Sequence, residues 1–163
     1  MQTIVENKQY LTFRLGEETY AADVSRVKEV LALVPVTRLP RMPEFMEGVI
    51  NIRGQVVPVV NLRRKFDMSQ VEDSVDTSII VMDVTVEGNN LTVGCLADSV
   101  DQVVGISSDR FQEAPSFGTK VDARFIEAIA NDDDREFIIV LDMNQVFGME
   151  EIDALDAGAR SSK

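Results

Sequence analysis

The sequence contains no histidine and no tryptophan, and it has a single cysteine, Cys95. Histidine is the commonest general base and the commonest ligand of transition metals, so its absence removes the usual starting point for catalysis and metal binding. One cysteine cannot form an internal disulfide, which is consistent with a reducing cytoplasm. Cys95 lies in an alternating apolar stretch, so we expect a buried core residue rather than a nucleophile. We therefore predict a protein that is not an enzyme, with no catalytic residue, no cofactor and no metal site.

Positive charge and long apolar runs are also scarce. Lys and Arg number 16 against 28 Asp and Glu, which gives a net charge of -12. This excess repels a phosphate backbone, so nucleic acid is a poor candidate partner. Apolar runs reach only five residues, as in Phe137 to Leu141, whereas roughly 20 are needed to span a bilayer. The N-terminus has no apolar core of the kind that a secretory signal requires. We expect a soluble, cytoplasmic protein with no direct membrane insertion.

What the sequence does contain is strand-like alternation. Residues 10–15 place Leu11, Phe13 and Leu15 on one face, and residues 19–24 return after a turn, which predicts a hairpin. The following stretch, 24–34, predicts a helical turn that passes into a strand near Val30. The second half predicts another hairpin, with strands at 78–86 and 91–96 around a turn at 88–90. These patterns favour a mostly β protein.

The two halves of the sequence align with each other. Residues 18–33 align with 91–106 without a gap, and 45–66 align with 125–147 after a one-residue gap. Identities are few, so chance similarity between two β-rich halves is the alternative to an internal duplication. We expect one domain over 7–150, with repeat copies at about 9–68 and 77–149 and with exchange of strands between them left open. We expect residues 151–163 to be a C-terminal tail.

Each predicted copy holds about five short strands, a helical turn after a proline segment and a closing helical turn. Small closed barrels fit this description, because closure removes exposed strand edges. Pro58 cannot donate a ladder hydrogen bond, so 56–60 should run along an edge or past a bulge. Asn61 and Asp142 follow the last strand of each copy, where either side chain is predicted to cap the next helical turn.

Two turns are candidates for function. The segment 131–136 concentrates carboxylates, with Asp132 to Asp134 at its centre, but it lacks the alternate ligand spacing of a calcium loop. A solvated turn is one interpretation, and an acidic small-barrel regulator that binds a divalent cation is the alternative. Arg53 lies between Ile52 and Gly54 at a turn flanked by apolar strands. An arginine on so apolar a frame is a plausible anchor for a partner, and an exposed arginine without a role is its alternative.

The stretch that contains Arg53 resembles the signature of CheW, the chemotaxis coupling protein family. Over Leu39 to Arg63 the features of that signature occur in order: paired prolines, a glycine before the strand, an Asn-apolar-Arg-Gly turn and, at the end, the sequence Pro-apolar-apolar-polar-Leu-Arg. The resemblance extends from about Gln9 to Gly148. Asn61 replaces the aspartate common in the family, and Ile52 replaces the usual leucine. Neither change alters the chemistry, because Asn caps as Asp does and Ile keeps the apolar contact.

The resemblance implies a fold of two five-stranded SH3-like barrel subdomains related by a pseudo-twofold, in agreement with the duplication. It also implies a noncatalytic adaptor that couples methyl-accepting chemoreceptors to the histidine kinase CheA. In such proteins the cytoplasmic tip of the receptor lies in an apolar groove between the subdomains. The matching receptor-binding positions here are Val27, Glu29, Val30, Arg53 and Gly54.

The resemblance implies a second surface, for the regulatory domain of CheA, which has the same fold. The positions that match the kinase-binding part of the family pattern are Val100, Val103 and Val104. By the same resemblance the protein is cytoplasmic and is recruited to membrane receptor arrays.

Overall fold

The computed structural model describes residues 7–112, 121–131 and 137–148, and most of its elements are strands. The first half contains β1 (Asn7–Leu15), β2 (Glu18–Asp23), η1 (Val24–Arg26), β3 (Val27–Ala32), β4 (Met46–Ile52), β5 (Gln55–Asn61) and α1 (Leu62–Lys65). The second half contains β6 (Ser78–Val86), β7 (Asn89–Ala97), β8 (Ser99–Ser107), η2 (Ser108–Arg110), β9 (Phe111–Gln112), η3 (Ala123–Phe125), β10 (Ile126–Asn131), β11 (Phe137–Leu141) and α2 (Met143–Val146). The predicted fold class, mostly β with short helical segments, is confirmed.

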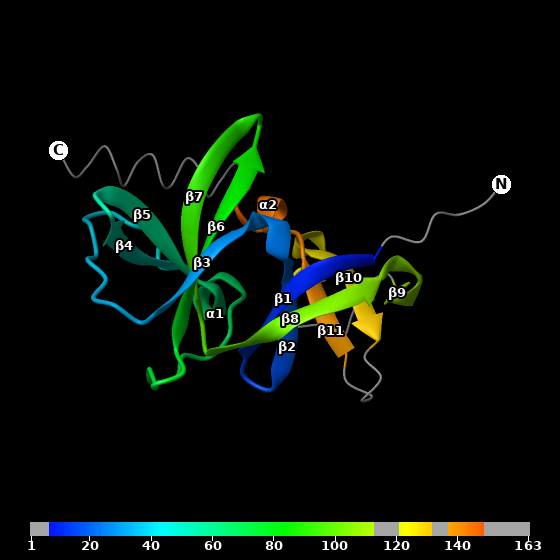
Figure 1. The fold of residues 1–163 in the computed structure, drawn as a ribbon. Helices are drawn as coiled ribbons and strands as arrows, with labels where there is room; N and C mark the ends of the chain where they lie inside the picture. Colours follow the sequence, from blue (N-terminus) through cyan, green and yellow to red (C-terminus); the bar gives the residue numbers. More distant parts are fainter. Residues whose placement is uncertain (1–6, 113–120, 132–136, 149–163) are drawn as a thin grey trace.

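The strands form two curled sheets, which lie side by side in Figure 1. We call the sheet with the order β8-β1-β2-β11-β10-β9 barrel 1 and the sheet with the order β3-β6-β7-β5-β4 barrel 2. In barrel 2, Thr37 follows β3 and closes onto β4: its N–H donates to the Val49 carbonyl at 2.9 Å, and the Val49 N–H donates back at 2.8 Å. In barrel 1, β8 and β9 act as one strand interrupted by η2, because β8 pairs with β1 while β9 pairs with β10. Each sheet is therefore a five-stranded SH3-like barrel.

Each barrel combines strands from the two halves of the sequence. Barrel 1 joins β1 and β2 to β8–β11, and barrel 2 joins β3–β5 to β6 and β7. The two parallel pairings, β2 with β11 and β5 with β7, connect one half to the other. The chain passes between the barrels twice, through η1 after β2 and through Asp98 between β7 and β8.

The main hydrophobic core lies between the barrels. This cluster, the central core, contains buried side chains from both sheets, and two smaller clusters fill the barrels themselves. Four aromatic rings run through the central core, with centroid distances of 6.0 Å between Phe13 and Tyr20, 6.3 Å between Tyr20 and Phe66, and 5.9 Å between Phe66 and Phe125. Such contacts fix the two barrels against each other.

Several local predictions are confirmed and one is corrected. Both predicted hairpins form, although β3 begins at Val27, earlier than the predicted start near Val30. The Asn61 and Asp142 side chains cap α1 and α2, accepting from the N–H groups of residues 64 and 145 at 3.1 and 3.3 Å. Cys95 is fully buried, and burial raises the pKa of its thiol.

Pro58 is not on an edge strand, because β5 lies between β4 and β7. The missing N–H is tolerated because the pairing with β7 begins only at Val59. On the other side of β5, the register of β4 shifts between Met46 and Gly48, close to this point. The proline therefore occupies the predicted irregular part of a sheet, but within a strand that has two neighbours.

In the part of the chain that the structure describes, no helix has the length and apolar character needed to cross a membrane.

Candidate partner-binding surfaces

The β4–β5 hairpin carries Arg53 at its tip. Arg53 and Gly54 both have left-handed backbone conformations, with φ of 49° and 86°. Paired positive φ values are typical of the tight turns whose twist matches that of hairpin strands. The Asn51 side-chain oxygen accepts a hydrogen bond from the Gly54 N–H at 2.8 Å and holds the turn. The turn predicted at Arg53 is confirmed, and 79% of the Arg53 side-chain surface is exposed to solvent.

Arg53 reaches across to Glu29 on β3. The two side chains form two contacts, Nη2 to Oε1 at 3.2 Å and Nη1 to Oε2 at 3.5 Å. An exposed ion pair of this kind contributes at most about 1 kcal/mol to stability, so its main effect is to orient the guanidinium. The pair borders a shallow hollow of about 280 Å³, which Lys28, Ile52 and Gln55 also line.

The three predicted receptor-binding residues of β3 are divided between the two faces of this strand, while Arg53 and Gly54 lie at the tip of the β4–β5 hairpin. Glu29 pairs with Val81, whose side chain packs inside barrel 2, whereas Val27 and Val30 pair with residues of the central core. Opposite residues of an antiparallel pair share a face. The structure therefore brings Glu29 and Arg53 together with Gly54, and it places the two valines on the other face.

Val27 and Val30 also differ in exposure. Val27 packs against the central core, while Val30 is 42% exposed. Because β3 is an edge strand of barrel 2, a partner lying along this edge can contact Val30 on one face and the Glu29–Arg53 pair on the other.

Val56, which the sequence analysis did not select, belongs beside this surface. It pairs with Asn51 next to the hairpin tip and is 65% exposed. The alternation along β5 could have predicted this exposure. Val57 and Val59 are buried, so Val56 points outward.

The predicted kinase-binding residues lie on barrel 1, along the edge strand β8. Val103 is 50% exposed, but Val100 packs against the central core and Val104 packs inside barrel 1. The register between β1 and β8 shifts in this stretch, and the Thr12 hydroxyl fills the irregularity by donating to the Gln102 carbonyl at 2.8 Å. Only Val103 of the three is an exposed apolar side chain.

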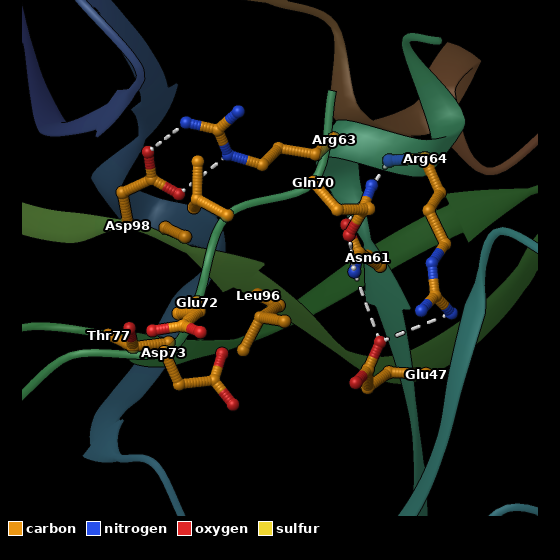
Figure 2. A pocket seen from close by; sticks show the side chains of 12 residues that line it. Glu47, Asn61, Arg63, Arg64, Gln70, Glu72, Asp73, Thr77, Leu96 and Asp98 are labelled. Carbon is orange, nitrogen blue, oxygen red and sulfur yellow. Dashed lines mark hydrogen bonds and ion pairs between the residues drawn. The ribbon is translucent and has the colours of Figure 1, made fainter. Parts of the chain in front are cut away.

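A polar pocket of about 260 Å³ lies beside α1 and the end of β7 (Figure 2). Both arginines that line the pocket form ion pairs. Arg63 makes a bidentate contact with Asp98, with Nε to Oδ1 at 2.9 Å and Nη2 to Oδ2 at 2.5 Å. The Arg64 guanidinium lies 3.5 Å from the Glu47 carboxylate. The Asn61 amide also donates to Glu47, at 3.1 Å. These groups pair with one another and form a polar network along one side of the pocket, which the carboxylates of Glu72 and Asp73 also line.

The hydrogen bond from Arg63 lowers the pKa of the Asp98 carboxyl below its ordinary value. An unfolded aspartate has a pKa of about 3.9, so the stabilisation from this pair is fully present above that value. It is lost as the pH falls through the lowered pKa of the folded state. The sequence analysis noted Arg63 only as part of the motif and did not select Asp98.

The cation-binding alternative depends on Asp132 to Asp134, which lie outside the described residues. Within the described ranges, no group of three or more cysteine or carboxylate side chains could hold a metal ion.

Comparisons with known proteins agree on one family. The family model described as a CheW-like domain matches residues 9–151. The chain is 30% identical over 154 residues to the chemotaxis protein CheW of Klebsiella aerogenes. This alignment covers 94% of the chain and 90% of that protein. It is 27% identical over 150 residues to the CheW of Treponema pallidum, covering 92% and 88%.

A solved structure gives the same result for the fold. The scaffolding protein TtCheW from Thermoanaerobacter tengcongensis superimposes with a TM-score of 0.78 at 33% identity. The match covers 90% of this chain and 91% of that one.

Proposed function

The chain belongs to the CheW family of noncatalytic chemotaxis scaffold proteins, and from this premise we propose that it couples methyl-accepting chemoreceptors to the histidine kinase CheA. The observation that carries the proposal is the Glu29–Arg53 pair, displayed on a held hairpin tip beside the edge strand β3. An oriented, exposed guanidinium beside the exposed apolar side chain of Val56, with Val30 exposed on the other face of the same edge, is a suitable anchor for a helical receptor tip.

The second proposed surface is Val103 on β8, which faces the regulatory domain of CheA. The two surfaces belong to different barrels, so both partners can be bound at once. A scaffold of this kind works by linkage: better binding to one receptor state is transmitted to the kinase as a coupling free energy, typically about 1–3 kcal/mol. Many copies in one array, recruited from the cytoplasm to the receptors, would raise the effective concentration of each weak contact.

Arg53→Ala is expected to weaken binding to a soluble receptor-tip fragment by about tenfold or more, as loss of an interface arginine does. Because the side chain is 79% exposed, the circular dichroism spectrum should stay unchanged. Calorimetric titration measures the affinity. Arg14→Ala is the matched control, since Arg14 also forms an exposed ion pair, with Asp101 at 3.3 Å, but on barrel 1.

Val30→Arg tests the other face of β3 in the same assay. Val30 is preferred to Val27 for this test because Val27 packs against the central core. Unchanged receptor affinity in both Arg53→Ala and Val30→Arg would show that this edge is not the receptor surface.

Val103→Asp is expected to weaken binding to the isolated CheA regulatory domain by about tenfold, because it places a charge in an apolar contact. Receptor binding should be retained, since Val103 lies on barrel 1. The same substitution at Val104 should instead lower the thermal midpoint, because that side chain packs inside the barrel. If Val103→Asp binds the kinase domain like the wild type, the kinase surface lies elsewhere.

A further inference from the structure

Asp98 occupies the point where the chain passes from barrel 2 into barrel 1. It is the single residue between β7 and β8. Its N–H donates to the Arg14 carbonyl at 3.0 Å, and its carboxylate accepts from the Gly16 N–H at 2.7 Å. Both contacts attach the beginning of β8 to the β1–β2 hairpin of barrel 1.

The same carboxylate is held from barrel 2 by Arg63. The guanidinium donates through Nε and Nη2 to the two oxygens of Asp98, as Figure 2 shows, and through Nη1 to the Ser69 carbonyl at 2.6 Å. The pair is mostly shielded from water, with side-chain exposures of 13% for Arg63 and 27% for Asp98. A bidentate contact between charged groups fixes the relative orientation of the two side chains as well as their separation, whereas an apolar contact does not fix orientation.

Arg63 is attached directly to the hairpin that carries Arg53. Strand β5 begins at Gln55, beside the hairpin tip, and ends at Asn61, whose side chain caps α1. Arg63 is the second residue of that helix. A continuous series of backbone and charged contacts therefore runs from the hairpin tip, through β5, α1 and Asp98, to β8.

The other passage between the barrels is held differently. There the Arg26 guanidinium donates to the Thr85 hydroxyl at 3.1 Å. Asn144, which occupies in α2 the place that Arg63 has in α1, accepts from the Thr85 N–H at 2.9 Å. These bonds reach neutral partners, so the Asp98 passage has the stronger and more directional connection.

We propose that Arg63 and Asp98 are a positioning pair that sets β8 relative to the β4–β5 hairpin and so couples the receptor surface to the kinase surface. This inference rests on the proposed function. Neither residue belongs to the proposed contact surfaces, so each acts through the strand that it positions.

The first test measures hydrogen exchange of the β8 amides by mass spectrometry. Asp98→Asn keeps the shape of the side chain but removes its charge. Arg63→Lys keeps the positive charge but removes the bidentate geometry of the guanidinium. Both should raise the exchange rate in β8 by about tenfold, the effect of losing a charge-assisted hydrogen bond. Asp101→Asn is the matched control, because it removes an exposed carboxylate from the same strand. Wild-type protection of β8 in Asp98→Asn would overturn the inference whatever the partners are.

The second test measures the affinity for the CheA regulatory domain with and without a saturating receptor-tip fragment. For the wild type the two affinities should differ by about 5- to 150-fold, the usual range of allosteric coupling. In Asp98→Asn and Arg63→Lys each partner should still bind alone with nearly wild-type affinity, while the ratio of the two affinities falls toward one. A merely structural role would lower both affinities and leave the ratio unchanged.

The outcomes separate this inference from the proposed function. If the wild type binds neither partner, the proposed function is wrong and the coupling role falls with it. If both partners bind but the wild type shows no coupling, the linkage part of the proposed function is wrong and the positioning role falls with it. If the wild type shows coupling but the variants keep the wild-type ratio, the positioning role is wrong while the proposed function stands.

Discussion

Gly48→Ala is expected to lower the free energy of unfolding by about 3 kcal/mol, through overpacking and backbone strain together. A Cβ at this position would lie 2.4 Å from the Thr37 carbonyl oxygen and 2.8 Å from a Val36 methyl carbon. Its φ of 148° also lies outside the range that side chains favour. The clash falls on the segment that closes barrel 2, because Thr37 is hydrogen bonded to the neighbouring Val49. Urea unfolding followed by circular dichroism measures the change.

Gly88→Ala is the matched control for this prediction. Gly88 has a φ of 80°, but nothing lies within 4 Å of a Cβ added there. Its replacement carries only the conformational cost, about 1 kcal/mol. Equal losses for the two variants would show that closure of barrel 2 does not depend on the missing side chain of Gly48.

Phe66→Ala is expected to lower the free energy of unfolding by about 3–5 kcal/mol, the usual cost of removing a buried aromatic ring. Phe66 is 4% exposed and lies at the end of α1, between the rings of Tyr20 and Phe125. The ring thus connects β2 and η3, which precedes β10 of barrel 1, with the helix of barrel 2 inside the central core. Because that core is shared, the loss should shift one cooperative transition rather than create a second.

Phe137→Ala provides the comparison, because this phenylalanine is 58% exposed. Surface substitutions usually change stability by less than about 0.5 kcal/mol. Separate unfolding transitions for the two barrels in Phe66→Ala would contradict the idea of a single shared core.

The sequence predicted the strands well, because alternation is a local signal. The hairpins at 10–23 and 78–97, the Arg53 turn and the two helix caps all follow from short-range chemistry. Alternation did not reveal that some strands are buried on both faces. In β2, Tyr20 and Ala22 face the central core while Ala21 packs inside barrel 1, and all three are fully buried.

The burial of the candidate site residues was harder to predict, since a family pattern does not show which way a valine points. Val27, Val100 and Val104 match the pattern, yet all three pack against core clusters. The exposed position of Arg53 follows from a turn that is visible in the sequence. The contacts of Asp98 were not predicted because they join it to residues 14, 16 and 63, which are far from it in the sequence.

The strand arrangement has a consequence for synthesis on the ribosome. Strand β2 emerges early, but its parallel neighbour β11 lies near the other end of the described chain, and β5 must wait for β7. Neither barrel can close from the first half alone, so the nascent chain exposes unpaired strand edges until much of the second half has been made. Such edges promote aggregation, and long-range pairing slows folding. We therefore expect the yield of native protein to depend on chaperones that bind the growing chain, more than for a protein whose two barrels each fold from consecutive strands.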